Sequence, residues 1–240
     1  NGEGTALGSL VIDDDDVDGI NAQGGASVLK AFGGLKARLA LRGEMQREQN
    51  PFLQTSGTDF TITGVKDMDV ARTKTVSSSY TDRRTNAGFV NLGLDYNGKY
   101  VGDVLYRREG SSLFGPENRW NTFYRASAAW LVSEEGWWNI PALSLFKLRY
   151  NVGTAGTRPD FADQYAALGI DGTGAVTRQA LGNPFLRPEI ATEQEYGMDV
   201  IFKNRVQWSL VFVDVMSKDN LIGMPAPGLT GFNTVELNSG

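Results

Sequence analysis

The chain has 240 residues, of which 41% are hydrophobic and 21% are charged, and its formal net charge is −5. It contains no cysteine and no histidine, which excludes disulfides, cysteine nucleophiles, zinc sites of the usual kind and histidine acid–base catalysis. The negative charge argues against a general nucleic-acid binder. Its 29 glycines and 10% aromatic residues favour strands and turns over helices.

The amino-terminal segment is rich in glycine and acidic residues. Residues 1–25 contain the run DDDDVD, Asp13–Asp18, and closely spaced carboxylates can bind calcium. The spacing does not match an EF-hand loop, so we interpret the run as a solvated acidic loop and leave calcium binding open. No basic-then-apolar signal sequence opens the chain, and no apolar run reaches the roughly 18–20 residues of a membrane-spanning helix.

Alternation with a period of two dominates the chain after residue 25. In Leu35–Met45 the odd positions are apolar or glycine, and the even positions, apart from Ala40, are charged. This pattern predicts a strand with one apolar and one charged face. It predicts six further strands, and an eighth is indicated near Ala26–Phe32. The six cover residues 90–96, 100–107, 124–132, 146–152, 193–202 and 206–212.

The connections between these strands alternate in length. Short turns are predicted at Asn97-Gly98, where both central residues favour positive φ, and at Lys203–Arg205, with a medium one at Glu134–Ala142. Because each strand reverses the chain direction, this alternation places all long loops at one end of the sheet, as in outer-membrane barrels. The long polar loops are expected at residues 46–84, 110–121, 153–191 and 217–240.

Two all-β architectures fit the alternation. A soluble β-sandwich also alternates and is rich in aromatic residues. Strands of ten or more residues, a strongly charged second face, and Tyr and Trp near the strand ends favour a membrane barrel, whose strands need only about 9–11 residues to span the bilayer. We therefore predict that the apolar face contacts lipid. The residues expected on that face are Val90, Leu92, Leu94, Tyr106, Trp130, Leu148, Val200 and Leu210.

Four ordered segments carry a family resemblance. They are KYVGDVLYRREGSSLFGPENRW (Lys99–Trp120), FYRASAAWLVSEE (Phe123–Glu135), LSLFKLRYNVGTAG (Leu143–Gly156) and NPFLRPEIATEQEYGMDVIFKNRVQWSLVFVDVMSKDNL (Asn183–Leu221). In this order they resemble the SusC-like TonB-dependent outer-membrane transporters of Bacteroidetes and related bacteria. The resemblance runs from about residue 86 to the end, and residues before about 84 match only as generic barrel strands. Glu109 and Arg187 stand where that family usually has Asp and Lys, which keeps the charge.

The resemblance implies an antiparallel transmembrane β-barrel segment of about seven or eight strands, with long loops at one end and short turns at the other. Residues 1–240 would be the middle part of one barrel of about 22 strands, with the plug domain, the TonB box and the barrel-closing strands outside it. It implies TonB-driven import of a glycan, oligopeptide or similar nutrient across the outer membrane, with a SusD-like surface lipoprotein as partner. The alternatives are a soluble carbohydrate-binding β-sandwich and an outer-membrane structural barrel that transports nothing.

No catalytic site, metal site or cofactor is expected. The neighbours Glu134 and Glu135 could suggest the carboxylate pair of a glycosidase, but adjacent strand residues point to opposite faces, so a turn-capping role is favoured. The charged strand faces would line the barrel lumen, where their residues could contact substrate, contact the plug or, most commonly, hold water. These candidates are Asp103, Arg107, Arg125, Lys147, Arg149, Glu193, Glu195 and Asp199.

The positions of two loop motifs predict which strand ends lie together. RREGSS, residues 107–112, could bind a sugar or phosphate, but the resemblance favours a structural hairpin head shaped by its glycines and proline. NPFLRPE, residues 183–189, is interpreted as an ordered loop that enters a strand. Counting strand reversals predicts Ser111–Asn118 and Asn183–Glu189 at one end of the strands, facing the cell exterior, and Asn97-Gly98 and Asn204 at the other.

Overall fold

The computed structural model describes residues 8–62, 64–65, 67–170 and 173–240. Within them the chain forms thirteen β-strands and three single turns of 3-10 helix, Met68–Val70 (η1), Val132–Glu134 (η2) and Gly228–Thr230 (η3). None of these helical turns is long and apolar enough to cross a membrane.

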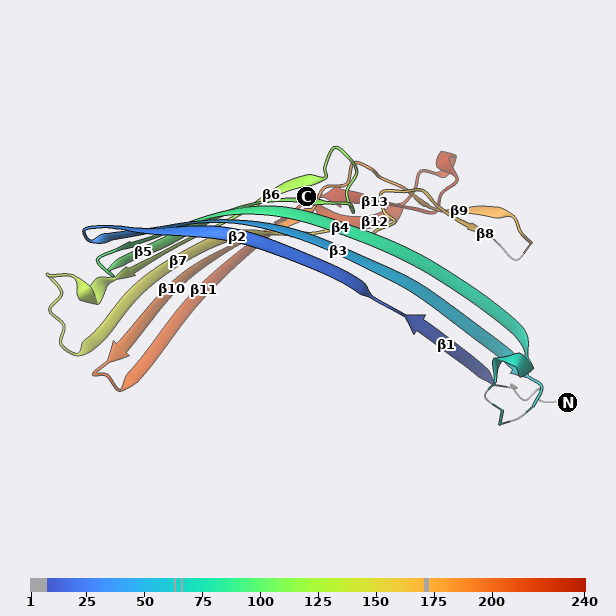
Figure 1. Cartoon of the computed structure of the whole chain (residues 1–240), viewed down its shortest axis with the longest axis horizontal. Helices are drawn as coiled ribbons and strands as arrows, with labels where there is room; N and C mark the ends of the chain where they lie inside the picture. Colours follow the sequence, from blue (N-terminus) through green and yellow to red (C-terminus); the bar gives the residue numbers. More distant parts are fainter. Residues whose placement is uncertain (1–7, 63, 66, 171–172) are drawn as a thin grey trace. The chain divides into compact units, whose positions relative to one another are not determined.

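The main sheet has nine strands in the order β1-β3-β4-β5-β6-β7-β10-β11, and β2 also pairs with β3. All eight predicted strands are present in it, and β5, β6, β7, β10 and β11 lie side by side in Figure 1. The strands are β1 Ser9–Asp15, β2 Asp18–Phe32, β3 Leu35–Phe60, β4 Ala71–Tyr96, β5 Tyr100–Ser111, β6 Trp120–Leu131, β7 Leu143–Thr157, β10 Glu189–Phe202 and β11 Val206–Lys218.

The chain divides into two compact units. The first comprises residues up to 21 and residues 46–84, and the second comprises residues 22–45 and 85–240. Strands β2, β3 and β4 contribute residues to both units.

The first unit corrects two expectations. Residues 46–84, expected as a loop, are mostly strand: β3 continues to Phe60, β4 begins at Ala71, and β1 pairs with Phe52–Thr58. The acidic run is mostly strand instead of loop: Asp13–Asp15 end β1 and Asp18 begins β2, with exposed side chains, and only Asp16 and Val17 connect them. Within the described part of the chain, no group of three or more acidic side chains is placed to hold a metal ion.

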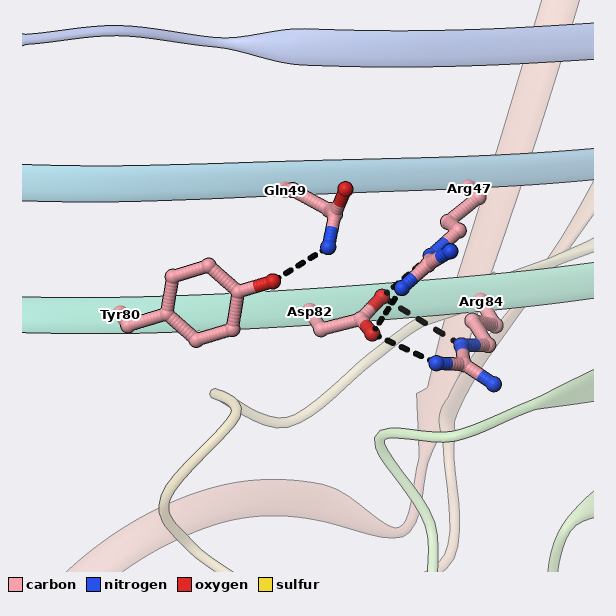
Figure 2. A network of polar contacts seen from close by, with 5 residues as sticks. All are labelled: Arg47, Gln49, Tyr80, Asp82 and Arg84. Atoms are coloured by element: carbon pink, nitrogen blue, oxygen red, sulfur yellow. Dashed lines mark hydrogen bonds and ion pairs between the residues drawn. The ribbon is translucent and has the colours of Figure 1, made fainter.

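A polar network links β3 and β4 in the first unit (Figure 2). Arg47 donates from Nε and Nη2 to the two carboxylate oxygens of Asp82, at 3.1 and 2.9 Å, and Arg84 Nη2 donates to the same carboxylate at 2.7 Å. Gln49 donates to the hydroxyl of Tyr80. Charge-assisted hydrogen bonds therefore support the pairing of these strands.

The second unit has the two-faced strands that the alternation predicts. The pairings of Val90 with Tyr106, of Trp130 with Leu148, and of Leu148 with Met198 place these side chains on one face of the sheet. Leu92, Leu94, Val200 and Leu210 share this apolar face through the same ladders. Six of the eight predicted residues are exposed, and Trp130 and Val200 are partly exposed. None of the eight lies in a buried core between two sheets.

The short turns lie together at one end of the strands. Asn97, Gly98, Lys203 and Asn204 all have positive φ, as the tight turns of a hairpin require. The turns are joined to their neighbours: the amide of Asn97 donates to the carbonyl of Gly34 at 2.8 Å, and that of Lys203 to the carbonyl of Ala142 at 2.9 Å. This confirms that the short turns share an end.

Aromatic rings form a continuous chain beside these turns, which we call the aromatic chain. Successive ring centroids lie 5.4 to 6.4 Å apart through Tyr96, Tyr100, Trp130, Trp137, Trp138 and Phe146. Glu135 joins part of it, because it accepts hydrogen bonds from the Tyr100 hydroxyl and from Trp130 Nε1, the latter at 3.0 Å. Lys99 Nζ lies 3.7 Å from the same carboxylate. Glu135 therefore bridges rings and an ammonium group rather than capping a turn.

The hairpin head, Ser111–Asn118, lies at the other end and is docked on the segment Asn183–Glu189. Asn118 Nδ2 donates to the carbonyl of Phe185 at 2.7 Å. A Cβ on Gly115 would stand 2.0 Å from the carbonyl oxygen of Pro184, so the two backbones meet where only glycine fits. Phe114 and Phe185 thus lie at the same end of the strands, as predicted.

Three of the best-buried apolar side chains of the second unit lie in this docked pair. Phe114 and Leu113 are 2% and 4% exposed in the hairpin head, and Leu186 is 0% exposed in the docked segment. Asn238 ties the docked segment further, since its amide donates to the carbonyl of Arg187 at 2.8 Å and its oxygen accepts from the amide of Arg187 at 2.8 Å. The loops at this end therefore contain a buried apolar cluster.

A second sheet of four strands also corrects the sequence analysis. Residues 153–191 and 217–240 were expected as polar loops, but parts of both form the order β12-β13-β9-β8. β13 and β9 pair in parallel, whereas the other neighbours are antiparallel. The strands are β8 Ala167–Ile170, β9 Val176–Leu181, β12 Asn220–Pro225 and β13 Thr234–Ser239.

Gly115→Val is expected to undock the hairpin head. The new side chain would overlap the carbonyl of Pro184, and such overpacking costs about 1–3 kcal/mol. Hydrogen exchange at residues 183–189 of the full-length protein should accelerate by about 5- to 150-fold. Gly136→Val is the matched control, since a Cβ there meets no atom within 4 Å. Equal exchange in both variants would contradict the docking.

Glu135→Gln is expected to weaken the aromatic chain in a pH-dependent way. The Tyr100 hydroxyl, followed by the Trp130 indole and then by Lys99, lowers the pKa of Glu135 below its ordinary value of 4.5. A lowered pKa stabilises the fold above pH 4.5, and the contribution is lost as the pH falls through the lowered pKa.

The measurement is thermal melting of the full-length protein in detergent. Above pH 4.5 the Glu135→Gln variant should melt below the wild type, and the difference should vanish in acid. Glu134→Gln, which changes the exposed neighbouring carboxylate, should match the wild type at every pH. A difference between Glu135→Gln and the wild type that does not shrink as the pH is lowered below 4.5 would contradict the bridging role.

Candidate functional site

The predicted lumen residues lie on the face of the second unit opposite the apolar face. One cross-strand row contains Asp103, Ser127, Asn151 and Glu195, because each of these pairs with the next across β5, β6, β7 and β10. The neighbouring row contains Arg125, Gly153 and Glu193, and Arg107, Lys147, Arg149 and Asp199 share the face by register. We call it the polar face.

Five of the eight candidates line a cavity of about 860 Å³ on this face. Small residues leave the space open, since Gly153 and Ala155 of β7 lie beside Ala191 of β10. Longer side chains of β4, β5 and β6 surround it, among them Phe89 and Phe123. The five candidates at the cavity are Asp103, Arg107, Arg125, Glu193 and Glu195.

The other three candidates lie outside this cavity, nearer the short turns. Arg149 reaches diagonally across the sheet, with its Nε 3.2 Å from Asp199 Oδ2. A Cβ on Gly197 would stand 2.5 Å from Arg149 Cγ, so this glycine provides the room for the arginine to cross β10. Ser209 donates to the other Asp199 oxygen at 2.6 Å. Lys147 lies directly opposite Asp199 in the ladder.

Asp103 is the acceptor for a group of donors in the cavity. Arg125 Nη2 donates to it at 2.8 Å and Asn91 Nδ2 at 3.1 Å, and the Ser127 hydroxyl donates as well. Three donors on neighbouring strands thus stabilise this carboxylate as an anion. The pair of Asp103 with Arg125 therefore joins β5 and β6 in the wall of the cavity.

A second charge cluster lies where the cavity approaches the hairpin head. The buried carboxylate of Glu109 accepts hydrogen bonds from both Arg107 and Arg158. The guanidinium of Arg107 also lies 4.9 Å from the ring centroid of Phe89, and its Nε is buried without a hydrogen-bond partner among the described residues. Two guanidinium groups share one carboxylate, which leaves a net positive charge here.

The wall opposite, on β10, is negative. Glu195 accepts from Asn151 Nδ2 at 3.0 Å. Glu193 is exposed, and no residue in the described part of the chain forms a hydrogen bond or an ion pair with it. The cavity therefore offers cationic groups near the hairpin head and carboxylates on β10. Such an arrangement can bind a polar or zwitterionic molecule by complementary charge.

The beta-barrel model of the TonB dependent receptor-like family matches residues 7–226. The chain belongs to the TonB-dependent receptor β-barrel family. The resemblance read from the ordered motifs is thereby confirmed, and the β-sandwich alternative is wrong. Barrels of this family lie in the outer membrane. In such barrels an apolar band faces lipid and a polar interior faces the lumen, so we expect the same of the two faces of this receptor segment and call them its lipid side and its lumen side. The family is one of receptors and transporters rather than an enzyme class.

Curated relatives and solved structures agree with this assignment. The receptor segment is 28% identical over 190 residues to TonB-dependent receptor P39 of Formosa agariphila, covering 75% of this chain and 18% of P39. It is 28% identical over 178 residues to receptor P26 of the same organism, covering 69% of this chain and 18% of P26. The segment thus spans less than a fifth of these relatives.

The RagAB peptide importer has the same fold. Its closed-closed state superposes with a TM-score of 0.81 at 17% identity, covering 96% of this chain and 27% of that chain. Its open-open state gives a TM-score of 0.79 at 17% identity, covering 97% and 26%.

The sequence analysis missed part of the receptor's cavity. Glu109 was noted only as a departure from the family pattern, and Arg158 was placed in a long loop with no assigned partner. The two are 49 positions apart, so no local spacing signals their pairing. Ser127 and Asn151 are uncharged and were passed over, although alternation places both on the polar face.

Glu109→Gln is expected to loosen the segment that carries Arg158. Removing the buried charge leaves two guanidinium groups facing a neutral amide, a change that costs about 3 kcal/mol. Hydrogen exchange at residues 157–165 of the full-length receptor should accelerate. Glu117→Gln, at an exposed position of the hairpin head, serves as the control. Unchanged protection in Glu109→Gln would show that the cluster does not hold the loop.

Proposed function

We propose that residues 1–240 are the middle part of one barrel of an outer-membrane importer that takes up a polar nutrient with energy supplied through TonB. The whole barrel would include a plug domain and closing strands outside this segment. The observation that carries the proposal is the cavity of about 860 Å³ on the lumen side, which holds charges of both signs. Membership in the TonB-dependent receptor family supports the energy source.

The substrate class follows from the lining of the cavity. Paired and unpaired charges lie beside the rings of Phe89 and Phe123, so the wall can bind ionic groups and apolar faces together. An oligopeptide presents both, and a glycan presents polar edges and apolar ring faces. The shared fold with the RagAB peptide importer is consistent with a peptide. We propose an oligopeptide, a glycan or a similar molecule.

We place the hairpin head and the second sheet at the cell exterior. The longer connections of outer-membrane barrels face outward and the short turns face the periplasm. The loops at this end contain a buried core, with Leu186 fully buried, so they form an ordered surface. A SusD-like surface lipoprotein is the proposed partner at this surface, and the TonB complex would act through the amino-terminal part of the receptor.

Gly153→Phe tests the import function. A Cβ at Gly153 would stand 3.5 Å from Arg125 Cγ, which is ordinary contact, so a larger side chain should extend into the cavity. Cells with the full-length receptor are given defined oligopeptides and oligosaccharides, and depletion from the medium is followed by mass spectrometry. Uptake should fall by about tenfold, equivalent to roughly 1.4 kcal/mol, at unchanged surface abundance.

Two controls define the outcome. Gly136→Phe lies in a turn where a Cβ meets no atom within 4 Å, and uptake should match the wild type. Deletion of TonB should abolish uptake. A structural barrel without transport would give no depletion in any strain, and that result would reject the proposed import.

A further inference from the structure

The lipid side of the second unit carries a hollow that the import function does not use. Two adjoining cavities of about 640 and 600 Å³ lie across β2, β3, β4 and β5. Both are lined by Gly24, Gly43 and Gly88, and Met45 and Tyr106 line one each. We call this surface the apolar groove. The groove exists because three neighbouring strands carry glycine there, and glycine has no side chain to fill the space.

Arg108 stands at the groove and lines both of its cavities. Its guanidinium carbon lies 6.0 Å from the ring centroid of Trp120, and the side chain is exposed. Among the described residues no carboxylate forms an ion pair with it, whereas Arg107 and Arg125 on the lumen side each have one. Arg108 is therefore a cation on the lipid side that lacks an anionic partner within the described part of the chain.

The position of Arg108 along the strand places it near the edge of the hydrocarbon layer. It lies eight residues beyond Tyr100 of the aromatic chain, or about 27 Å along the strand. With the usual strand tilt this is about 20 Å along the barrel axis, against an apolar band about 25 Å tall. β11 agrees, because Asp214 of the same face lies eight residues beyond the turn end at Val206. On β5 and on β11, a charged side chain thus occurs on the lipid side eight residues from the short-turn end of the strand.

We propose that the apolar groove and Arg108 form a binding site for a phosphate-bearing lipid of the outer leaflet. An acyl chain lies over Gly24, Gly43 and Gly88, and the lipid phosphate accepts hydrogen bonds from the Arg108 guanidinium. The complementary charge and height identify the occupant, because a lipid phosphate is the anion found at the edge of the hydrocarbon layer and guanidinium binds phosphate in bidentate geometry. Trp120 packs beside this contact, where its amphipathic ring is favoured.

The site rests on the proposed orientation of the strands and does not depend on import. Loss of lipid binding and loss of uptake are therefore separate results. The lumen cavity is lined from the opposite face of the sheet, so substitutions at Arg108 leave its lining unchanged.

The test measures lipid binding to the purified full-length receptor by native mass spectrometry. The probes are diphosphorylated lipid A, the same lipid A after enzymatic removal of its phosphates, and inorganic phosphate alone. Arg108→Gln should weaken binding of the diphosphorylated lipid by about tenfold, the size of one lost charge-assisted hydrogen bond. Arg108→Lys should retain part of the affinity. The dephosphorylated lipid should bind the wild type and Arg108→Gln equally.

A second variant tests the groove itself. Gly88→Leu fills it without a backbone clash, because a Cβ there meets no atom within 4 Å, and it should weaken lipid A binding in both phosphorylation states. The matched controls are Gly93→Leu and Arg38→Gln, which alter the polar face and should bind as the wild type does. Gly93 also has open space around it, and Arg38 shares its face with Arg42, whose guanidinium lies over the ring of Phe89.

Three outcomes would overturn the proposal. One is equal binding of diphosphorylated lipid A by the wild type and Arg108→Gln. Another is equal loss in the Arg38→Gln control, which would indicate attraction by total charge alone. A third is binding of inorganic phosphate at Arg108 with the affinity of the lipid, which would make the acyl chain irrelevant.

Discussion

Backbone hydrogen bonding between neighbouring strands is the constraint on which the rest of this receptor segment depends. The hydrocarbon layer offers no water to amides, so each strand that crosses it must satisfy its amides through its neighbours. The ladder then fixes which side chains share a row, and a slip of one residue would move Asp103 and Arg125 to the lipid side. The positive-φ turns at Asn97-Gly98 and Lys203-Asn204 hold the register, because a tight turn allows only one pairing of its two strands.

The strands that cross the membrane were predictable because lipid and water impose opposite demands on alternate residues. Where both faces of a strand meet water, the alternation of apolar and polar residues disappears. Residues 46–60 and 71–84 form long strands without an apolar stripe, and for that reason alternation does not predict them. β8, β9, β12 and β13 are only four to six residues long, too short for periodicity to distinguish them from loops.

The candidate site was predictable in its location but only partly in its composition. Alternation places Asp103, Arg125 and Glu195 on one face, and register then brings them to one cavity. The contact of Glu109 with Arg158 depends instead on how a loop folds back over a strand end. Tertiary packing of this kind has no local spacing, and neither does the docking of Gly115 against Pro184.

The charges of the lumen side are arranged so that most of the wall is self-neutral. The pairs of Asp103 with Arg125 and of Asp199 with Arg149 join neighbouring strands, and they retain some electrostatic strength because part of their surface is shielded from water. Around the cavity, the carboxylates without an ion-pair partner among the described residues are Glu193 and Glu195 on β10, and excess positive charge lies at the two arginines that share Glu109. A narrow set of side chains thus determines the electrostatic character of a wide surface.

The docking of the hairpin head on residues 183–189 has a mechanical consequence. The head continues β5 and the docked segment leads into β10, so their contact spans the two strands β6 and β7 that separate them in the sheet. Tension applied to the docked segment from outside is therefore transmitted to β5 as well as to β10. The docked loops therefore couple the ends of β5 and β10. A molecule that binds one of these loops and pulls on it would shift both strand ends together.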